Sequence, residues 1–262
     1  MTEYFYPQDR AQLVWDLLNQ KSVCVGEWHA QHGDQMRFRE MLDVTIRTSV
    51  PKSPSALVSL LDRANHDWAE EHFQERVSTY PLNPPPSHER WPFGNTSTHM
   101  NGDQFSHTYP ERFWPKFANE GMRRPNGRQV FVPHNGIRFE YGDLFDLIRV
   151  LRNNGNTRQA YLPIWFPEDL QAARQGERVP CSLGYHFQIR SGRLRCHYAL
   201  RSCEFKRHFD DDLYMAARLM QWVCANVPGV EPGLLTTDIY NLHVLEADCP
   251  LLETEALSAL TS

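Results

Sequence analysis

Two stretches of alternating apolar and polar residues, joined by Ser191-Gly192, form the clearest structural pattern in this sequence. Residues 183–190 place Leu, Tyr, Phe and Ile at every second position, and residues 193–200 do the same with Leu, Cys, Tyr and Leu. A period of two puts the apolar side chains on one face of a strand, and Ser-Gly suits a tight turn. The pattern therefore predicts an antiparallel hairpin with one buried face.

The two-residue turn also fixes which residues face one another across the hairpin. Ile189 is expected to face Leu194, and pairing outward from there brings Cys181 opposite Ser202, with Arg201 beside it. A β-bulge would shift this pairing by one residue. The register thus predicts that a thiol, a hydroxyl and a guanidinium meet at the open end of the hairpin.

The rest of the pattern predicts a mixture of helices and strands in a single domain spanning residues 1–262. Apolar residues at helical spacing indicate helices, and shorter alternating or apolar runs indicate further strands. The expected helices are roughly the first 20 residues, 56–77, 141–151 and 212–227, and the expected strands are 42–46 and 158–166. Residues 79–127 are rich in proline and irregular, which is typical of a binding-loop region within a compact protein.

The composition is that of an ordinary globular protein, with 262 residues, 41% of them hydrophobic, and a net charge of −5. A dedicated DNA-binding protein normally has a basic face, and a membrane helix needs an apolar run of about 20 residues. The sequence shows neither, its six cysteines form no CxxC pair, and its polar N-terminus does not resemble a signal peptide. We therefore expect a cytoplasmic protein with no nucleic-acid or membrane partner.

The sequence does not predict a metal site. Twelve scattered histidines make chance pairs such as His29 and His32, or His197 and His208, common. The acidic run at 210–212 begins a predicted helix, where acids complement the free amides and the helix dipole; magnesium binding is the weaker alternative. The GxSxG, Walker and GxGxxG motifs do not occur, so serine hydrolase, P-loop and Rossmann interpretations lack support.

Cys181 is the first candidate for chemistry. A cysteine at the start of a strand is often only a small buried apolar residue. A neighbouring guanidinium, however, favours the nucleophilic thiolate, and the same guanidinium can bind a phosphate through two parallel hydrogen bonds. Cys181 and Arg201 therefore indicate a nucleophile beside an anion site, although this pair alone is not specific.

Five motifs give the chain a resemblance to the thymidylate synthase family. The segments TRQAYLPIW and VPCSLGYHFQIRSGRLRCHYALRSCE are similar to the family's SRR-x5-W and PC-x19-RSxD motifs. Asp212, eleven residues after Arg201, and His243, ten residues after Gly233, match two further spacings. Tyr109, in HTYPERFW, is similar to the YG-x-R/Q motif. The resemblance is most specific over the C-terminal third of the chain and is poor over the N-terminal part.

This resemblance implies an α+β, thymidylate synthase-like fold, in which a large mixed β-sheet is flanked by helices and packs against a second sheet in a homodimer. It implies a pyrimidine nucleotide as substrate and 5,10-methylenetetrahydrofolate as co-substrate, with no metal. Cys181 would be the nucleophile that adds to C6 of the pyrimidine, and Arg201 and Ser202 would bind its 5′-phosphate. Arg158 would reach the phosphate in the neighbouring subunit, whereas Gln159 stands where the family has a second arginine.

Four further assignments follow from the same resemblance. Tyr109 belongs with the catalytic residues, and His243 belongs with the substrate-binding residues. Glu204 stands where the family has an aspartate near the folate pterin. Glu71 is the candidate for the family's catalytic glutamate, with Glu70 as a close rival.

Two departures from the family pattern indicate a particular substrate. Asp212 replaces an asparagine that suits uracil, whereas a carboxylate only accepts hydrogen bonds and suits the N4 amine of cytosine. An aspartate at this position resembles the family's cytidylate 5-hydroxymethylases. Leu245 replaces a tyrosine that binds the sugar 3′-hydroxyl in the family, so both CMP and dCMP remain candidate substrates.

The sequence thus leads to the hypothesis of a folate-dependent cytidylate 5-hydroxymethyltransferase. Cys181 would add to C6, and water would capture the methylene group after its transfer to C5. Two alternatives stay open. One is a methylating synthase that acts on dUMP or a cytosine nucleotide, and the other is a degenerate homologue that binds a nucleotide or another protein without turnover.

Overall fold

The computed structural model describes residues 2–19, 23–26, 36–91, 100–118 and 142–260. The helices and strands, in chain order, are β1 (Thr2–Phe5), α1 (Arg10–Leu18), β2 (Val23–Gly26), β3 (Met36–Ser49), α2 (Pro54–Leu60), α3 (His66–Val77), η2 (Pro86–Arg90), β4 (Met100–Asn101), β5 (Gln104–Phe105), α4 (Tyr109–Phe113), α5 (Leu144–Asn153), β6 (Ala160–Pro163), α6 (Asp169–Arg174), β7 (Ser182–Arg190), β8 (Arg193–Leu200), β9 (Cys203–Glu204), α7 (Phe209–Asn226), β10 (Glu231–Leu245), η4 (Glu246–Asp248) and α8 (Cys249–Leu260).

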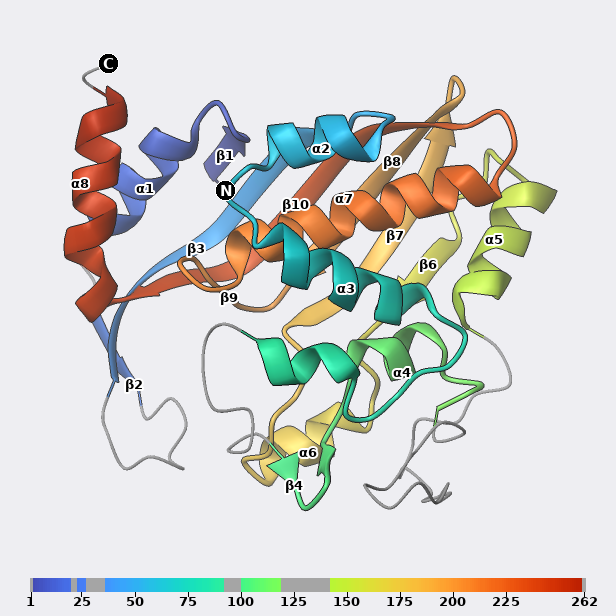
Figure 1. Ribbon diagram of the computed structural model, residues 1–262, viewed down its shortest axis with the longest axis horizontal. Helices are drawn as coiled ribbons and strands as arrows, with labels where there is room; N and C mark the ends of the chain where they lie inside the picture. Colours follow the sequence, from blue (N-terminus) through green and yellow to red (C-terminus); the bar gives the residue numbers. More distant parts are fainter. Residues whose placement is uncertain (1, 20–22, 27–35, 92–99, 119–141, 261–262) are drawn as a thin grey trace.

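A large mixed sheet is the centre of this arrangement. Its strands follow the order β1-β3-β10-β8-β7-β6, with β2 paired to β3 and β9 paired to β10. Strand β10 runs parallel to β8 and antiparallel to β3, so strands from both halves of the sequence are interleaved. Helix α7 packs against the sheet, α2 and α3 pack against α7, and α1 and α8 lie side by side near β1 (Figure 1). The expected mixed sheet flanked by helices is confirmed.

The hairpin β7–β8 has the predicted register near its turn, where Ile189 faces Leu194. Ser191 and Gly192 both have positive φ values, 52° and 72°, as a tight two-residue hairpin turn requires. Toward the open end, the register shifts by one residue between Ser182 and Gly184. Arg201, rather than Ser202, consequently lies opposite Cys181, and its backbone N–H donates to the Cys181 carbonyl at 2.9 Å.

The two faces of the sheet differ in exposure, as the alternating pattern predicts. Tyr185 and Tyr198 are buried on the helix-covered face and their rings stack with centroids 4.3 Å apart. Arg195 and His197 of β8 point to the other face and are exposed. The sheet is therefore covered by helices on one face of the hairpin and accessible on the other.

The single helix expected at 56–77 is two helices, α2 and α3. Asn65 separates them because its side chain accepts a hydrogen bond from Trp68 N at the start of α3. Its own backbone N–H donates to Asp211 at 2.7 Å, which ties the break to α7. Apolar periodicity continued through the break, so the sequence did not reveal it.

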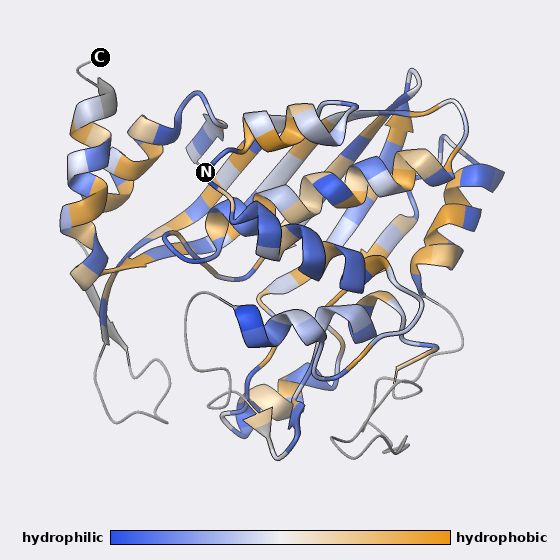
Figure 2. Ribbon diagram, in the orientation of Figure 1, coloured by the Kyte–Doolittle hydropathy of each residue, from blue (hydrophilic) through white to orange (hydrophobic). Residues whose placement is uncertain are grey.

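Helix α5 shows the expected amphipathic pattern. Leu144, Leu147, Ile148 and Leu151 are buried at positions one helical turn apart, and Figure 2 shows hydrophilic and hydrophobic residues on different sides of this helix. Strand β6 is shorter than the 158–166 segment that was expected. Residues 86–91 and 100–113 contain the short elements η2, β4, β5 and α4, and residues 92–99 and 119–127 of the proline-rich stretch lie outside the described part of the chain.

A buried ion pair joins α4 to α6. Arg112, which is 3% exposed, donates two hydrogen bonds of 2.8 Å to the carboxylate of Asp169 and one to the carbonyl of Ile164. Asp169 also accepts from the backbone N–H of Phe166 at 2.8 Å. A bidentate pair with additional hydrogen bonds satisfies the charge of both groups. The pair therefore fixes two loops that lead toward Cys181.

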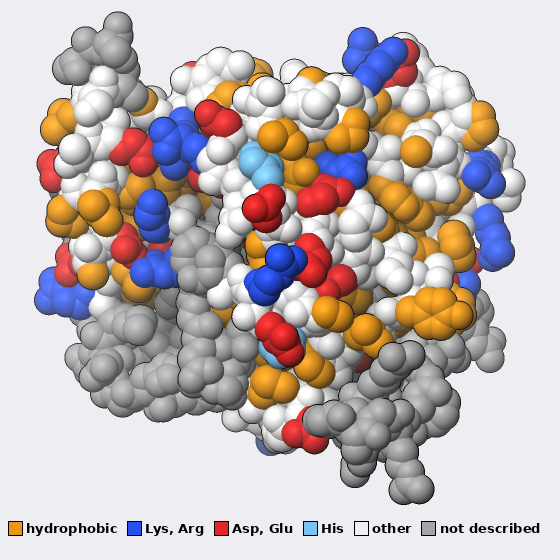
Figure 3. Space-filling model, viewed as in Figure 1, with side chains coloured by type: hydrophobic (Ala, Val, Ile, Leu, Met, Phe, Trp, Pro, Cys, Tyr) orange, Lys and Arg blue, Asp and Glu red, His pale blue; other side chains and the backbone are white. Residues whose placement is uncertain are grey.

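Acidic and basic side chains are interspersed on the face of the molecule that Figure 3 shows. This face, over the described residues, presents no extended region of positive charge. Among the described helices, none is both long and apolar enough to cross a membrane.

Candidate active site

Cys181 and Arg201 meet at the open end of the β7–β8 hairpin. The Arg201 guanidinium lies 3.9 Å from Cys181 Sγ, and it donates to the carbonyls of Pro180 at 2.8 Å and Val179 at 3.2 Å. Arg201 therefore both fixes the segment before the cysteine and places a positive charge beside the thiol. Cys181 and Arg201 are each partly exposed, so the pair is not sealed in the interior. The predicted proximity of thiol and guanidinium is observed.

The surroundings of Cys181 nevertheless favour the neutral thiol over the thiolate. Burial raises its pKa above the ordinary value of a cysteine, and this effect outweighs the lowering by Arg201 and Arg178; Asp212 raises the pKa further. Arg201 thus favours the thiolate, as expected, but its effect is smaller than that of burial. The thiol needs an additional change, such as the binding of a ligand, to become a nucleophile.

Ser202 and His243 lie together next to this pair. Ser202 Oγ is 3.5 Å from His243 Nδ1, which is also 3.1 Å from Asn241 Oδ1. His243 is buried, and burial lowers its pKa to about 4, so the ring is neutral at physiological pH. In the β9–β10 pairing, Glu204 lies directly beside His243. The structure thus brings three predicted residues, Arg201, Ser202 and His243, to one place.

Asp212 lies in the first turn of α7 and is partly exposed. Its Oδ2 accepts a long contact from the Cys203 thiol at 3.9 Å. Burial raises the pKa of Asp212 to about 7, although Arg76 lowers it, and Asp211 raises it further. Neutral and ionised forms of this side chain are therefore both accessible near neutral pH.

The other two acids of the 210–212 run have separate partners. Asp210 accepts from the Tyr6 hydroxyl and lies near Arg10, whereas Asp211 accepts from the Asn65 backbone. No side-chain hydrogen bond caps the start of α7. The run therefore does not act as the helix cap that the sequence suggested.

Tyr109, at the start of α4, belongs to the same cluster. Ser182 Oγ donates to the Tyr109 hydroxyl at 3.3 Å and is 2.6 Å from the Tyr198 hydroxyl. Burial raises the pKa of Tyr109 to about 12, and the nearby Cys181 and Asp212 raise it as well. A chain of neutral hydroxyl groups therefore extends from the sheet to the region of the thiol.

The structure does not bring the predicted glutamates of α3 into this cluster. Glu71 forms an ion pair with Arg90, and Glu70 accepts from Arg218 and from the Tyr214 hydroxyl, each at 2.8 Å. Glu71 is thus engaged by η2 and Glu70 by α7. Both carboxylates thus have partners outside the Cys181 cluster, and the assignment of a proton-relaying glutamate stays a prediction.

Glu204 and Arg158, the two remaining predicted site residues, have hydrogen-bond partners of their own. Glu204 is buried and binds the backbone N–H and guanidinium of Arg207, while burial raises its pKa. Arg158 is exposed just before β6, and its carbonyl accepts from His186 Nε2 at 2.9 Å. The Arg158 side chain is exposed, and its expected contact with the phosphate in a partner subunit stays a prediction.

Two cationic residues of the cluster were missed by the sequence interpretation. Arg178, three residues before Cys181, lowers the pKa of the thiol, and its proximity in sequence could have indicated this. Arg76 lies over the ring of Tyr109 at 4.2 Å, although 33 positions separate them in the chain. No local signal identified Arg76, since its place depends on how α3 packs against α4.

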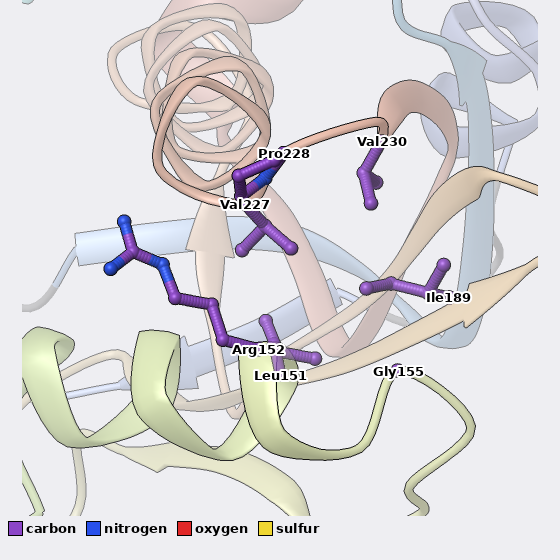
Figure 4. A pocket seen from close by; sticks show the side chains of 7 residues that line it. All are labelled: Leu151, Arg152, Gly155, Ile189, Val227, Pro228 and Val230. Carbon is purple, nitrogen blue, oxygen red and sulfur yellow. The ribbon is translucent and has the colours of Figure 1, made fainter.

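The structure gives less support to two other kinds of site, a metal site and a groove at the other end of the hairpin. No group of three or more potential ligands for a metal ion occurs among the described residues, and His29 and His32 lie outside them. A groove between Leu151, Ile189 and Val227 lies at the turn end of the hairpin (Figure 4). Because Cys181 precedes the opposite end of β7, this groove is separate from the thiol.

Comparison with known proteins agrees with the geometry of this cluster. The thymidylate synthase family model matches residues 101–258, which include every member of the Cys181 cluster except Arg76. A putative thymidylate synthase of Methanosarcina acetivorans is 30% identical over 107 residues, which are 41% of this chain and 48% of that protein. A putative thymidylate synthase of Methanococcoides burtonii is 29% identical, also over 107 residues, which are again 41% of this chain and 48% of that protein. The chain thus spans about half the length of the curated relatives it matches.

A thiol beside a guanidinium at the end of a large mixed sheet defines a candidate nucleophilic transferase site. The family match covers more than half of the chain. The chain belongs to the thymidylate synthase family, whose members use methylenetetrahydrofolate and a pyrimidine nucleotide.

Proposed function

We propose that the protein is a one-carbon transferase that modifies C5 of a pyrimidine nucleotide with 5,10-methylenetetrahydrofolate. The observation that carries this proposal is the contact of 3.9 Å between Cys181 Sγ and the Arg201 guanidinium. Ser202 and His243 adjoin this pair, and Asp212 and Tyr109 influence its charges. The cluster combines a nucleophile, an anion site and a polar edge for a base.

In the proposed reaction, Cys181 Sγ loses its proton and forms a bond to C6 of the ring. The electron pair of the C5–C6 double bond then makes C5 nucleophilic, and C5 bonds to the one-carbon unit that the folate supplies. Loss of the C5 proton and cleavage of the bond between the methylene carbon and tetrahydrofolate leave an exocyclic methylene group on C5. Water adds to this methylene group, and departure of Sγ from C6 then restores the C5–C6 double bond. Arg201 stabilises the thiolate and, with Ser202, binds the phosphate. The covalent bond to Sγ divides one difficult substitution into easier steps.

We further propose that the base is cytosine. An ionised Asp212 accepts from the N4 amine, and a neutral Asp212 both accepts from that amine and donates to N3. Each protonation state that the pKa of about 7 allows can therefore bind the cytosine edge. Leu245 supplies no hydroxyl group for the sugar, so CMP and dCMP are both candidate substrates.

Water capture of the transferred carbon would give 5-hydroxymethyl-CMP or 5-hydroxymethyl-dCMP. The balanced reaction consumes one water and releases tetrahydrofolate. A methylating enzyme instead takes a hydride from the folate and releases dihydrofolate. The hydroxymethyl outcome follows from the likeness of Asp212 to the cytidylate branch of the family.

The active unit proposed here is a homodimer formed through the accessible face of the sheet. Tyr161 and Tyr240 are 50% and 48% exposed on β6 and β10, which is unusual for large aromatic side chains. Arg158 lies beside this region and is exposed. Packing two such faces together would cover the aromatic residues and let Arg158 reach the phosphate in the partner's site.

Product analysis tests this proposed function. The protein is incubated with 5,10-methylenetetrahydrofolate and CMP, dCMP or dUMP, and the nucleotides and folates are identified by mass spectrometry. We expect hydroxymethylated cytidylate together with tetrahydrofolate. A methylated product with dihydrofolate would favour the synthase alternative. No product from any of the three nucleotides would favour a binding-only homologue.

A further inference from the structure

Arg76 is a buried cation that the proposed reaction does not use. It lies in the last turn of α3 and is 3% exposed. Its guanidinium carbon lies 4.2 Å from the centre of the Tyr109 ring, and its backbone carbonyl accepts from Trp114 Nε1 at 3.0 Å. Its Nε has no hydrogen-bond partner among the residues that the structure describes. The side chain is therefore held in the cluster by packing.

An incompletely paired guanidinium is costly to bury unless a negative charge or another acceptor compensates for it. Helix α3 packs on both α4, which begins with Tyr109, and α7, which carries Asp212 in its first turn. Arg76 and Asp212 form no direct ion pair, yet Arg76 is the group that most strongly stabilises the ionised form of Asp212. The two charges thus act on one another across the site.

The other groups that face Asp212 are neutral or negative near pH 7. On its own helix, Asp211 is a second acid whose pKa is raised to about 6. The remaining groups are thiols and phenols whose pKa values are raised by burial: Cys181, Cys203, Tyr109, Tyr185 and Tyr198. Among these neighbours of Asp212, Arg76 alone carries a positive charge.

We propose that Arg76 is a positioning residue for base recognition, which sets the charge that Asp212 presents to the pyrimidine. Arg76 would thereby determine the pH range in which the site distinguishes cytosine from uracil. This inference rests on the proposed function, since it assumes that Asp212 faces the base.

The physical basis is the different hydrogen bonding of the two forms of Asp212. The ionised carboxylate only accepts, so it can bind the N4 amine of cytosine but leaves O4 of uracil unpaired. The neutral acid donates and accepts, so it can match either base. Preference for cytosine should therefore increase as Asp212 ionises. Loss of the Arg76 charge should move that increase to higher pH.

The first test measures the ionisation of Asp212 in the ligand-free protein. Carboxyl carbon NMR of aspartate-labelled protein is followed against pH, and Asp212→Asn identifies the resonance. We expect Arg76→Met to raise the midpoint by about one pH unit and Arg76→Lys to keep it close to that of the wild type. Arg218→Met, which removes the α7 cation that pairs with Glu70 of α3, is the control and should leave it unchanged. Equal midpoints in wild type and Arg76→Met would overturn the proposal.

The second test connects this ionisation to the base. The dissociation constants for UMP and CMP are measured between about pH 6 and about pH 8.5, and the UMP value is divided by the CMP value. This ratio removes the effect of the phosphate, whose pKa of about 6 is common to both nucleotides. In the wild type the ratio should rise as the pH increases. In Arg76→Met the same rise should occur at higher pH, and in Asp212→Asn the ratio should not change with pH. A ratio that is independent of pH in the wild type would contradict the link to recognition. Failure of the wild type to bind either nucleotide would refute the proposed function itself, whereas the NMR midpoints would still decide the role of Arg76.

Discussion

Burial controls the charge of the two side chains that matter most in this site. Cys181 is largely enclosed by the protein although partly exposed, and burial raises the pKa of its thiol even though Arg201 lies 3.9 Å away. Asp212 is close to half ionised at neutral pH for the same reason. Both groups therefore respond to small changes in their surroundings, such as the arrival of a nucleotide.

The reactivity of Cys181 gives a direct test of this description. We expect alkylation of Cys181 by iodoacetamide in the ligand-free protein to reach half its maximal rate only above about pH 9. Arg201→Met should move the midpoint higher, because Arg201 lowers the pKa most strongly. Rates are measured on the Cys181 peptide by mass spectrometry, with the exposed Arg195→Met as control. A midpoint below about pH 8 would contradict the account.

Asp212 should also make stability dependent on pH. Its pKa is raised in the folded state from 3.8 to about 7, so folding is favoured while the acid stays protonated, and this contribution is lost as the pH rises through 7. Asp212→Asn cannot ionise. The gain in unfolding free energy from Asp212→Asn should thus be larger at pH 8 than at pH 5, by on the order of 2 kcal/mol. Urea unfolding at the two pH values measures it, and equal gains would argue against a raised pKa.

At the scale of secondary structure, local patterns predicted the hairpin but not the orientation of α3. The turn and the alternating residues set the pairing of β7 with β8, which brought Cys181 and Arg201 together in the analysis of the sequence. The one-residue shift near Ser182 has no signature in the apolar pattern. The rotation of α3, which buries Arg76 and directs Glu71 outward, depends on its packing against α4 and α7.

The link between α4 and α6 provides a prediction at this scale. Arg112→Met would leave Asp169 buried without its partner, which should cost about 3 to 5 kcal/mol in unfolding free energy. The double variant Arg112→Met with Asp169→Leu removes both charges and should recover much of the loss. Chemical denaturation of the three proteins gives the comparison. If the double variant were as unstable as the single one, an unpaired charge would not be the cause.

For the whole molecule, the pairing of distant strands was beyond the reach of the sequence. Strand β10 lies between β3 and β8, and no local pattern indicates that a strand at 231–245 joins one at 36–49. The resemblance to a family supplied the overall class of fold, since it carries tertiary information that periodicity lacks. His243 could be brought to Cys181 and Ser202 only on that basis.

The proposed homodimer makes a prediction about shared sites. Cys181→Ala lacks the nucleophile, and Arg158→Ala lacks the group that we expect to act in the partner's site. Each variant alone should be inactive, whereas a mixture allowed to exchange subunits should regain about a quarter of the wild-type activity through mixed dimers. Arg195→Ala, on the same face, is the control and should be active alone. Full activity of Arg158→Ala would exclude the shared site.

The central claim is that Cys181 bonds to C6 of a pyrimidine and thereby activates C5. Its most direct test is the release of tritium from CMP or dCMP labelled at C5, with 5,10-methylenetetrahydrofolate present. The account predicts release by the wild-type protein and none by Cys181→Ala, while nucleotide binding persists in both. Undiminished release by Cys181→Ala, or no release by a wild-type protein that binds the nucleotide, would contradict it.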